Sequence, residues 1–319
     1  STFRPGEPCT IKMPADFRLW SPESPNLYDF TAKFGGDEIK GYFAMRKFEK
    51  RKDAKGVLRF FLNNEPYYVM ATLDQGWWPD GLLTPPSDEA MAFDIRTLMD
   101  CGFNAMRKHI KVEPLRYYAL CDRMGILVLQ DMPSSAHGWR DMYNPAMTRA
   151  YGMYRAELRD MIDHLRKVPS IVMWVPYNEG WSQPDWNLTH TTLDFVRRYD
   201  PTRLVCGPSG HNDFEGGVIV GREKGKRTTK HLPFGECEAA DVVDVHAYRG
   251  PGMPPVNERR VSFLGEFGGL GHRVDGHYWG DSDQGRAVGT KKGVFAYGGM
   301  KDTSTREGLE KTCLGLIEK

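Results

Sequence analysis

The chain lacks a close pair of cysteines, an excess of charge of either sign, and any apolar run long enough to cross a membrane. Its six cysteines lie far apart with no Cys-x-x-Cys spacing, which argues against a zinc site and against a disulfide framework. The 43 basic and 42 acidic side chains nearly cancel, whereas a nucleic-acid-binding chain usually carries a basic excess. We therefore expect no metal, no cofactor, and neither a nucleic acid nor a membrane as partner. No signal-peptide pattern opens the chain, yet a signal could have preceded Ser1, so the sequence leaves the compartment open, together with the oligomeric state.

From about Asp53 onward, short apolar runs alternate with amphipathic stretches. This rhythm is typical of parallel β-strands joined by helices, and 319 residues suffice for one barrel-sized core with a small appendage. The sequence thus predicts the α/β class and a (β/α)8 TIM barrel. Strands are predicted at residues 67–73, 104–110, 126–130, 171–175, 203–207, 242–245 and 261–264, and helices at 87–101, 114–125, 148–166, 185–199 and 305–319.

Both ends of the chain depart from a plain barrel. An eighth strand is not recognisable after Gly269, and because a barrel needs closure, we expect a fragment or an unusual C-terminal region. Near the N-terminus, strand-like pieces are broken by prolines, and residues 39–49 alternate like an exposed β-ribbon. We interpret residues 1–52 as the remnant of an immunoglobulin-like β-sandwich with its crossover, and residues 53–319 as the barrel domain.

Two glutamates follow predicted buried strands. Glu179 comes shortly after the apolar run 171–175, and Glu266 after the weaker run 261–264, with glycines close behind each. Such positions lie at the C-terminal rim of a parallel barrel, where the active sites of barrel enzymes are built. A convergent pair of carboxyl groups is the machinery of glycoside hydrolysis. The alternative is that both glutamates end strands by chance and pair with basic side chains.

Aromatic residues make up 12% of the chain, and several tryptophans fall in predicted loops. Large aromatics often fill cores, but exposed aromatic faces also stack on sugar rings. Neighbouring glycines and prolines favour the second interpretation for Trp77, Trp78 and Trp181, and Trp279 also lies in a predicted loop.

In this order and spacing, several motifs resemble glycoside hydrolase family 2. This family comprises retaining exo-glycosidases, among them β-galactosidases, β-glucuronidases and β-mannosidases. Asn178-Glu179-Gly180-Trp181 resembles its acid/base strand, and Gly265-Glu266-Phe267-Gly268-Gly269 its nucleophile strand. Residues 19–28 resemble the end of the family's sandwich domain, and residues 41–47 resemble its crossover into the barrel. Residues 102–109 resemble its second barrel strand. The N-terminal sugar-binding domain of the family is missing, and residues 216–239 look like an inserted surface loop.

The resemblance implies a retaining exo-glycosidase that hydrolyses terminal β-glycosidic bonds of a carbohydrate substrate. Glu179 would then be the general acid/base and Glu266 the nucleophile, while Tyr248 would hydrogen-bond to Glu266. A β-galactoside is the default substrate, with β-glucuronidase or β-mannosidase specificity, or an inactive carbohydrate-binding fragment, as alternatives.

Strand alternation adds further candidates for substrate binding. Arg107 and His109 share one face of a strand; Arg107 is expected to be the electrostatic partner of the nucleophile, and His109 to reach a sugar hydroxyl. Asn178 is expected to bind the 2-hydroxyl. Asp131 either binds a sugar hydroxyl or caps a loop. His246 shares a strand face with Asp244 and Tyr248.

A metal-dependent barrel hydrolase is a competing interpretation. It would use His109, Asp131, His211 and His246 as ligands. Enzymes of that class typically carry closely spaced histidines on the first strand, and the predicted first strand has none.

Overall fold

The structure, a computed structural model, describes residues 4, 7, 10–134, 145–210, 217–223, 226–231, 239–247, 251–270 and 305–318. Five parallel strands form one sheet in the order β10-β9-β8-β7-β6, so each strand lies beside its neighbour in the sequence. Two further strands, β13 and β14, pair in parallel. The bounds are β6 (Ala71–Asp74), β7 (Ala105–Lys108), β8 (Leu127–Asp131), β9 (Ile171–Val175), β10 (Leu204–Val205), β13 (Val242–Ala247) and β14 (Val261–Phe267).

Asp241 joins the two parallel groups of strands. Its backbone N–H donates to the carbonyl of Val205 at 2.8 Å, and its carboxylate accepts from the Val205 N–H at 2.9 Å. The start of β13 therefore continues the sheet beyond β10, and the seven strands of the described residues follow one another as in a TIM barrel. The sequence predicted all seven, although β6 begins four residues later than expected.

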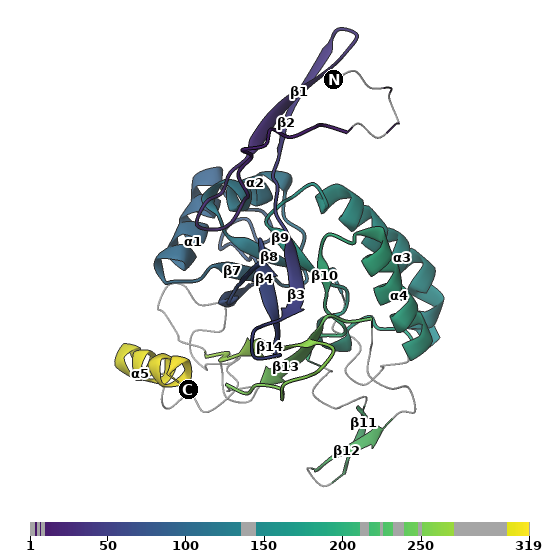
Figure 1. Cartoon of the computed structure of the whole chain (residues 1–319). Helices are drawn as coiled ribbons and strands as arrows, with labels where there is room; N and C mark the ends of the chain where they lie inside the picture. Colours follow the sequence, from purple (N-terminus) through teal and green to yellow (C-terminus); the bar gives the residue numbers. More distant parts are fainter. Residues whose placement is uncertain are drawn as a thin grey trace.

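Helices cover the outside of the sheet (Figure 1). Their ends follow the local sequence: the Ser87 hydroxyl accepts from the Ala90 N–H at the start of α1, and Gly125 ends α2 in the left-handed conformation at φ 83°. The helices are α1 (Asp88–Asp100), α2 (Leu115–Met124), α3 (Pro145–Leu165), α4 (Trp186–Tyr199) and α5 (Arg306–Ile317). No helix of the described residues is both long and apolar enough to span a membrane.

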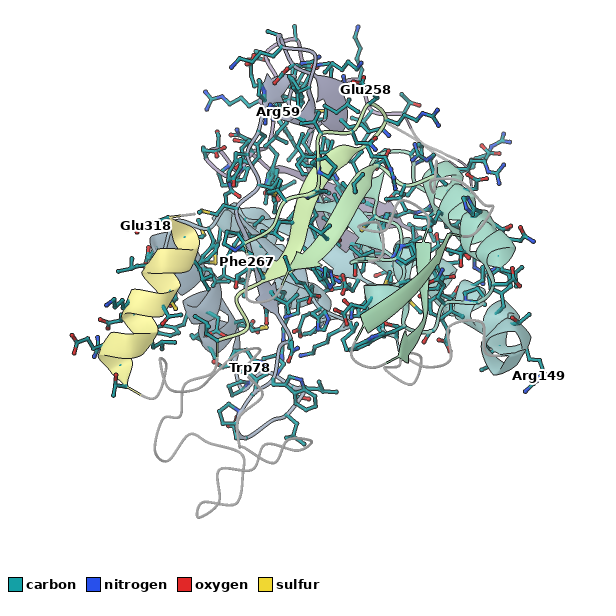
Figure 2. All side chains as sticks on the ribbon, turned by 90° about the horizontal axis from the view of Figure 1, so that it is seen from below. Arg59, Trp78, Arg149, Glu258, Phe267 and Glu318 are labelled. Carbon is teal, nitrogen blue, oxygen red and sulfur yellow. The ribbon has the colours of Figure 1, made fainter. Side chains whose placement is uncertain are left out.

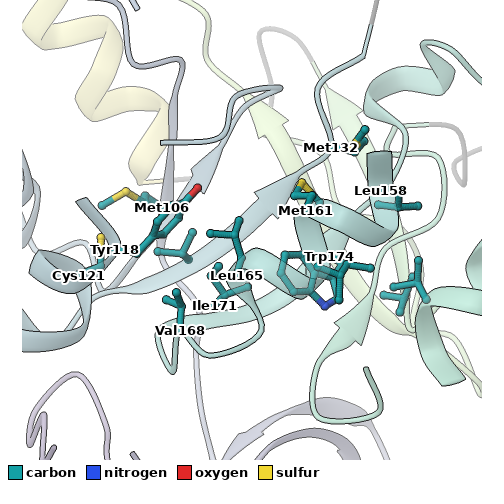
Figure 3. Packing of buried hydrophobic residues seen from close by; sticks show 14 of the residues in the cluster. Met106, Tyr118, Cys121, Met132, Leu158, Met161, Leu165, Val168, Ile171 and Trp174 are labelled. Atoms are coloured by element: carbon teal, nitrogen blue, oxygen red, sulfur yellow. The ribbon is translucent and has the colours of Figure 1, made fainter. Parts of the chain in front are cut away.

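Alternating side chains of each strand pack on opposite sides of the sheet. Met106 of β7 and Val128 of β8 face the helices and belong to a buried cluster that also contains Leu158 and Ile162 of α3. Figure 3 shows Met106 beside Tyr118 of α2 at one side of this cluster. Their strand neighbours, such as Leu127 and Leu129, face the barrel interior instead. This separation into two cores follows from the two-residue period of a strand.

An antiparallel sheet of β3 (Phe48–Lys52), β4 (Leu58–Leu62) and β5 (Glu65–Pro66) closes one end of the barrel. Phe48, Phe60 and Leu62 pack with residues that begin parallel strands, including Ala105 and Leu127. The covered end is thus the N-terminal end of the barrel. Figure 2 shows Arg59 of this sheet at one end of the molecule, with Phe267 and Trp78 toward the other, which leaves the C-terminal rim for a functional site.

Two hairpins extend from the barrel (Figure 1). The first pairs β1 (Tyr28–Phe34) with β2 (Asp37–Phe43), close to the strand pieces that the sequence predicted. The second pairs β11 (Gly217–Glu223) with β12 (Lys226–His231), in a segment predicted to be a surface loop. The sequence prediction therefore missed the regular pairing of this inserted segment.

Candidate functional site

Glu179 and Glu266 meet at the C-terminal rim of the barrel. Glu179 lies in η1 (Asn178–Gly180), four residues beyond the end of β9, and Glu266 is the penultimate residue of β14. One carboxylate oxygen of each glutamate and one ring nitrogen of His246 all lie within 4.8 Å of one another. This separation resembles the spacing of about 5–5.5 Å in retaining glycosidases and is well below the 6.5–9.5 Å of inverting ones.

A β-bulge aligns Glu266 with the site. Between β13 and β14, Val245 pairs with Leu264, but the next residue, His246, pairs with Glu266, so Gly265 is the extra residue. Because side chains alternate along a strand, this single extra residue changes the face on which Glu266 lies relative to β13. The bulge thus places the Glu266 carboxylate beside the His246 ring.

His246 lies between the two glutamates. Its Nδ1 is 2.8 Å from Glu179 Oε1 and 3.3 Å from Glu266 Oε2. Its Nε2 lies 3.4 Å from Arg107 Nη1. The sequence predicted a substrate-binding residue, whereas the structure gives the imidazole direct contacts with both carboxylates.

Arg107 is the electrostatic centre of the site, and only 3% of its surface is exposed. Its Nη1 donates to Glu266 Oε1 at 3.0 Å, while Nε and Nη2 donate to the two oxygens of Asp131 at 2.9 and 3.0 Å. Burial alone would lower the pKa of the guanidinium, but the Asp131 and Glu266 charges outweigh it and raise the pKa of Arg107 above its ordinary value. Its permanent positive charge disfavours a metal cation between the same carboxylates, so the arrangement suits a catalytic pair better than a metal centre.

Asp131 and Asn178 accept hydrogen bonds from the guanidinium of Arg107. Asp131 is fully buried, and besides Arg107 it accepts from the Ile110 N–H at 3.2 Å. The sequence left open whether Asp131 binds a sugar hydroxyl or caps a loop, and in the structure its carboxylate binds the Arg107 guanidinium and the backbone just beyond β7. Asn178, also buried, accepts from Arg107 Nη2 at 2.6 Å.

Glu179 adopts a backbone conformation that is rare for a residue with a side chain, with φ 48° and ψ 28°. Such a conformation costs on the order of 1–3 kcal/mol and needs surrounding structure to hold it. Ser209 provides part of that support, since its hydroxyl accepts from the Glu179 N–H at 3.0 Å and from Arg107 at 3.1 Å. Sequence reasoning missed Ser209, which follows a strand of only two residues and carries no motif.

Asp244 is a buried carboxyl group beneath the site. Its Oδ2 accepts from the Cys206 thiol at 3.3 Å, and Oδ1 has no hydrogen-bond partner within the described part of the chain. Burial is the main cause that raises the pKa of Asp244 to about 7. A Cβ at position 265 would lie 2.1 Å from Asp244 Oδ1, so this close approach explains the glycine before Glu266.

We expect Asp244→Asn to remove a pH dependence of stability. The carboxyl has an ordinary pKa of 3.8 and a folded value of about 7, so the folded state binds more protons between these values and loses stability as pH rises through this window. The full difference corresponds to about 4 kcal/mol. In urea unfolding at pH values from 4 to 8, the free energy of unfolding of the variant relative to that of the wild type should rise with pH until about pH 7. A difference in unfolding free energy between the variant and the wild type that stays constant with pH would contradict this expectation.

The loop after β6 presents Trp77 to solvent, with 61% of its surface exposed. A buried ionic network holds the loop. Asp74 accepts from the Gly76 N–H at 2.8 Å, and Lys111 Nζ donates to the Gly76 carbonyl at 2.6 Å. Lys108 Nζ lies 2.7 Å from Asp74 Oδ2. The Asp74 carboxylate therefore binds both a buried lysine and the backbone of the loop, so Asp74 caps the loop.

The same loop reaches the site through His109. Gln75 Nε2 lies 3.4 Å from His109 Nδ1, and His109 Nε2 lies 3.8 Å from Glu266 Oε1. The Trp181 ring meets the His109 ring edge to face at 6.1 Å. His109 and Trp181 therefore line the Glu266 side of the site. Tyr248 and Trp279 lie outside the described residues.

Comparisons with known proteins relate this chain to glycoside hydrolases. Residues 86–221 match the family model described as glycosyl hydrolases family 2, TIM barrel domain. The chain is 27% identical over 268 residues, 78% of its length, to a putative beta-glucuronidase of Formosa agariphila, and 25% identical over 211 residues, 64% of its length, to a beta-galactosidase of Leuconostoc mesenteroides. It covers only 24% and 19% of these two relatives, respectively.

Among solved structures, the fold is similar to that of a beta-galacturonidase from Eisenbergiella tayi. The TM-score is 0.56 at 24% sequence identity, over 66% of this chain and 36% of that one. At this identity the similarity concerns the fold alone.

Proposed function

On the premise that this chain belongs to glycosyl hydrolases family 2, we propose that it is a retaining exo-β-glycosidase that works by double displacement. The observation that carries the proposal is the proximity of Glu179 and Glu266 at the C-terminal rim, with carboxylate oxygens within 4.8 Å. A retaining mechanism needs one carboxylate as nucleophile and one carboxylic acid at this short separation.

The two glutamates differ in their surroundings, which supports separate roles. Glu266 accepts a hydrogen bond from the permanently charged Arg107 guanidinium at 3.0 Å, and this contact orients its carboxylate as a nucleophile requires. The Glu179 side chain is more exposed, 17% against 6%, as suits a group that must exchange protons with a leaving group and with water. We therefore assign Glu266 as nucleophile and Glu179 as general acid/base.

In the first step Glu266 attacks the anomeric carbon while Glu179 gives its proton to the glycosidic oxygen. The carbon–oxygen bond to the leaving group breaks, and a bond between sugar and Glu266 forms. In the second step Glu179, now ionised, takes a proton from water, whose oxygen attacks the anomeric carbon and releases Glu266. No metal or cofactor takes part in this scheme.

Contacts to the sugar are assigned to the rim residues. Asn178 is adjacent to the acid/base and is proposed to bind the 2-hydroxyl, a contact that strengthens in the transition state. His109 is proposed to bind another hydroxyl, and Trp77 to stack on the substrate through its exposed face. Tyr248 is proposed to hydrogen-bond to Glu266 at the substrate side of the site, and Trp279 to contact the substrate, as the sequence suggests.

The chain spans less than a third of the length of the curated relatives that it matches. We propose that residues 1–52 are the remnant of an immunoglobulin-like sandwich with its crossover, and residues 53–319 the catalytic barrel. The projecting β1–β2 hairpin, on which Phe34 and Ile39 are exposed, supports a preceding domain. The crossover ends in β3, which pairs with β4 at the closed end of the barrel. We further propose that the barrel is incomplete at its eighth strand.

A panel of 4-nitrophenyl β-glycosides tests the function, with this chain and the full-length gene product measured side by side. We expect hydrolysis of one β-glycoside, with β-galactoside as the default and β-glucuronide and β-mannoside as alternatives. Sugar binding without hydrolysis by either protein would favour the alternative of an inactive carbohydrate-binding protein.

A further inference from the structure

His246 is held on every side by groups of known hydrogen-bonding character. Glu179 and Glu266 face Nδ1 from η1 and β14, while Arg107 of β7 faces Nε2 at 3.4 Å. Asp244, on the same strand as His246, places Oδ1 3.7 Å from Nε2. Among the described residues, three carboxyl groups and one guanidinium therefore lie beside the two ring nitrogens.

The glycine after Ser209 fixes the plane of the ring. Gly210 adopts the left-handed conformation at φ 66°, and a Cβ there would lie 2.7 Å from His246 Cγ and 2.8 Å from Nδ1. The Gly210 backbone is thus packed directly against the imidazole. Rotation of the ring would drive it into this backbone or away from both glutamates.

The contacts of the ring select one tautomer. A guanidinium can only donate hydrogen bonds, so the 3.4 Å contact between Arg107 Nη1 and His246 Nε2 is a hydrogen bond when Nε2 is the acceptor. A neutral imidazole with an accepting Nε2 carries its proton on Nδ1. The Nδ1–H then donates to Glu179 Oε1, its nearest carboxylate oxygen at 2.8 Å.

We propose that His246 is a positioning residue that, by donating from Nδ1 to Glu179 Oε1, fixes the catalytic proton of Glu179 on Oε2. This inference rests on the proposed function and adds to it a reason why the proton is available to the substrate. A proton on Oε1 would face the Nδ1–H and break this 2.8 Å contact, so the Nδ1–H would keep only the longer contact of 3.3 Å with Glu266 Oε2.

The same contact assists the reaction after proton transfer. When the Oε2 proton moves to the glycosidic oxygen and the carbon–oxygen bond breaks, negative charge develops on Glu179. A hydrogen bond to an ionised group is stronger than one to a neutral group, so the Nδ1–H bond strengthens as the reaction proceeds. An interaction that strengthens toward the transition state increases the rate of the chemical step.

Two amide variants distinguish the roles of the two ring nitrogens of His246. In His246→Asn the side-chain amide can occupy the place of Nδ1, whereas in His246→Gln it reaches the place of Nε2. We expect His246→Gln to lose about 100-fold in kcat/KM on an alkyl β-glycoside, which needs a proton on its leaving group, as general acid catalysis contributes on the order of 10²–10⁴. On a 2,4-dinitrophenyl β-glycoside, which hardly needs that proton, its kcat/KM should fall several-fold at most. His246→Asn should restore most of the alkyl-glycoside activity.

If His246 had a merely structural role, kcat/KM would fall by the same factor on both substrates, and His246→Asn and His246→Gln would behave alike. Either result would overturn the proposal. Thermal unfolding of both variants checks that they fold. Failure of the proposed function itself would be seen separately, as a wild-type protein that hydrolyses no β-glycoside. For that case, the ¹⁵N resonances of His246, assigned by their loss in His246→Asn, test the tautomer without turnover. Protonated Nδ1 with bare Nε2 is expected, and the opposite tautomer would refute the inference.

Discussion

Glu266→Gly should abolish turnover of every glycoside, whatever its leaving group. The variant lacks the group that bonds to the anomeric carbon, so no glycosyl-enzyme forms, and kcat/KM should fall by a factor on the order of 10⁵–10⁶, the scale seen when a covalent nucleophile is removed. Spectrophotometric assays with 2,4-dinitrophenyl and alkyl glycosides measure this loss. The factor by which kcat/KM falls should be the same for both substrates.

Glu179→Ala should behave differently with the same substrates. Proton donation contributes on the order of 10²–10⁴, so the alkyl glycoside should lose about that factor in kcat/KM, whereas the dinitrophenyl glycoside should lose far less. Glu258→Ala, an exposed glutamate beside Lys52 at the opposite end of the barrel, is the matched control and should leave both rates unchanged. Equal losses for Glu179→Ala on both substrates would contradict its role as acid.

Arg107→Leu should be strongly destabilising as well as inactive. The substitution leaves the buried Asp131 and Glu266 carboxylates without their cation, and breaking a buried charge pair in this way costs about 3–5 kcal/mol. Urea unfolding measures the loss of free energy. Arg59→Leu, which removes a half-exposed partner of Asp53, should cost far less, because solvent screens that ion pair.

The double variant Arg107→Leu with Asp131→Leu sharpens this expectation. If the cost comes from an unpaired buried charge, removing Asp131 as well should recover part of the stability. A single variant as mild as Arg59→Leu, or a double variant less stable than the sum of its parts, would show that Arg107 does not hold the site together electrostatically.

Much of the barrel could be predicted because its signals are local. The apolar run before Glu179 became β9, and the ends of α1 and α2 follow from Ser87 and Gly125, whose effects act within a few residues. The meeting of Glu179 and Glu266 followed from topology, since all parallel strands of a barrel end at one rim.

Other features depend on contacts between distant segments, and no local pattern announces them. Ser209 accepts a hydrogen bond from the backbone of Glu179 across thirty residues, and Asp131 forms a buried ion pair with Arg107 across two strands. The bulge at Gly265 changes the register between β13 and β14, so simple alternation along β13 did not place His246 between the glutamates. The β3–β4 pairing was missed because its role is to cover a barrel end that exists only in the folded chain.

The configuration of azide adducts, followed by proton NMR, tests the two assigned roles most directly. In Glu266→Gly, azide can attack from the side that the nucleophile vacated, so the glycosyl azide should have inverted configuration. In Glu179→Ala, azide should intercept the glycosyl-enzyme, and two successive inversions should yield a product of retained configuration. An inverted adduct from Glu179→Ala, or a retained one from Glu266→Gly, would show that the nucleophile and the acid/base have been exchanged in this account.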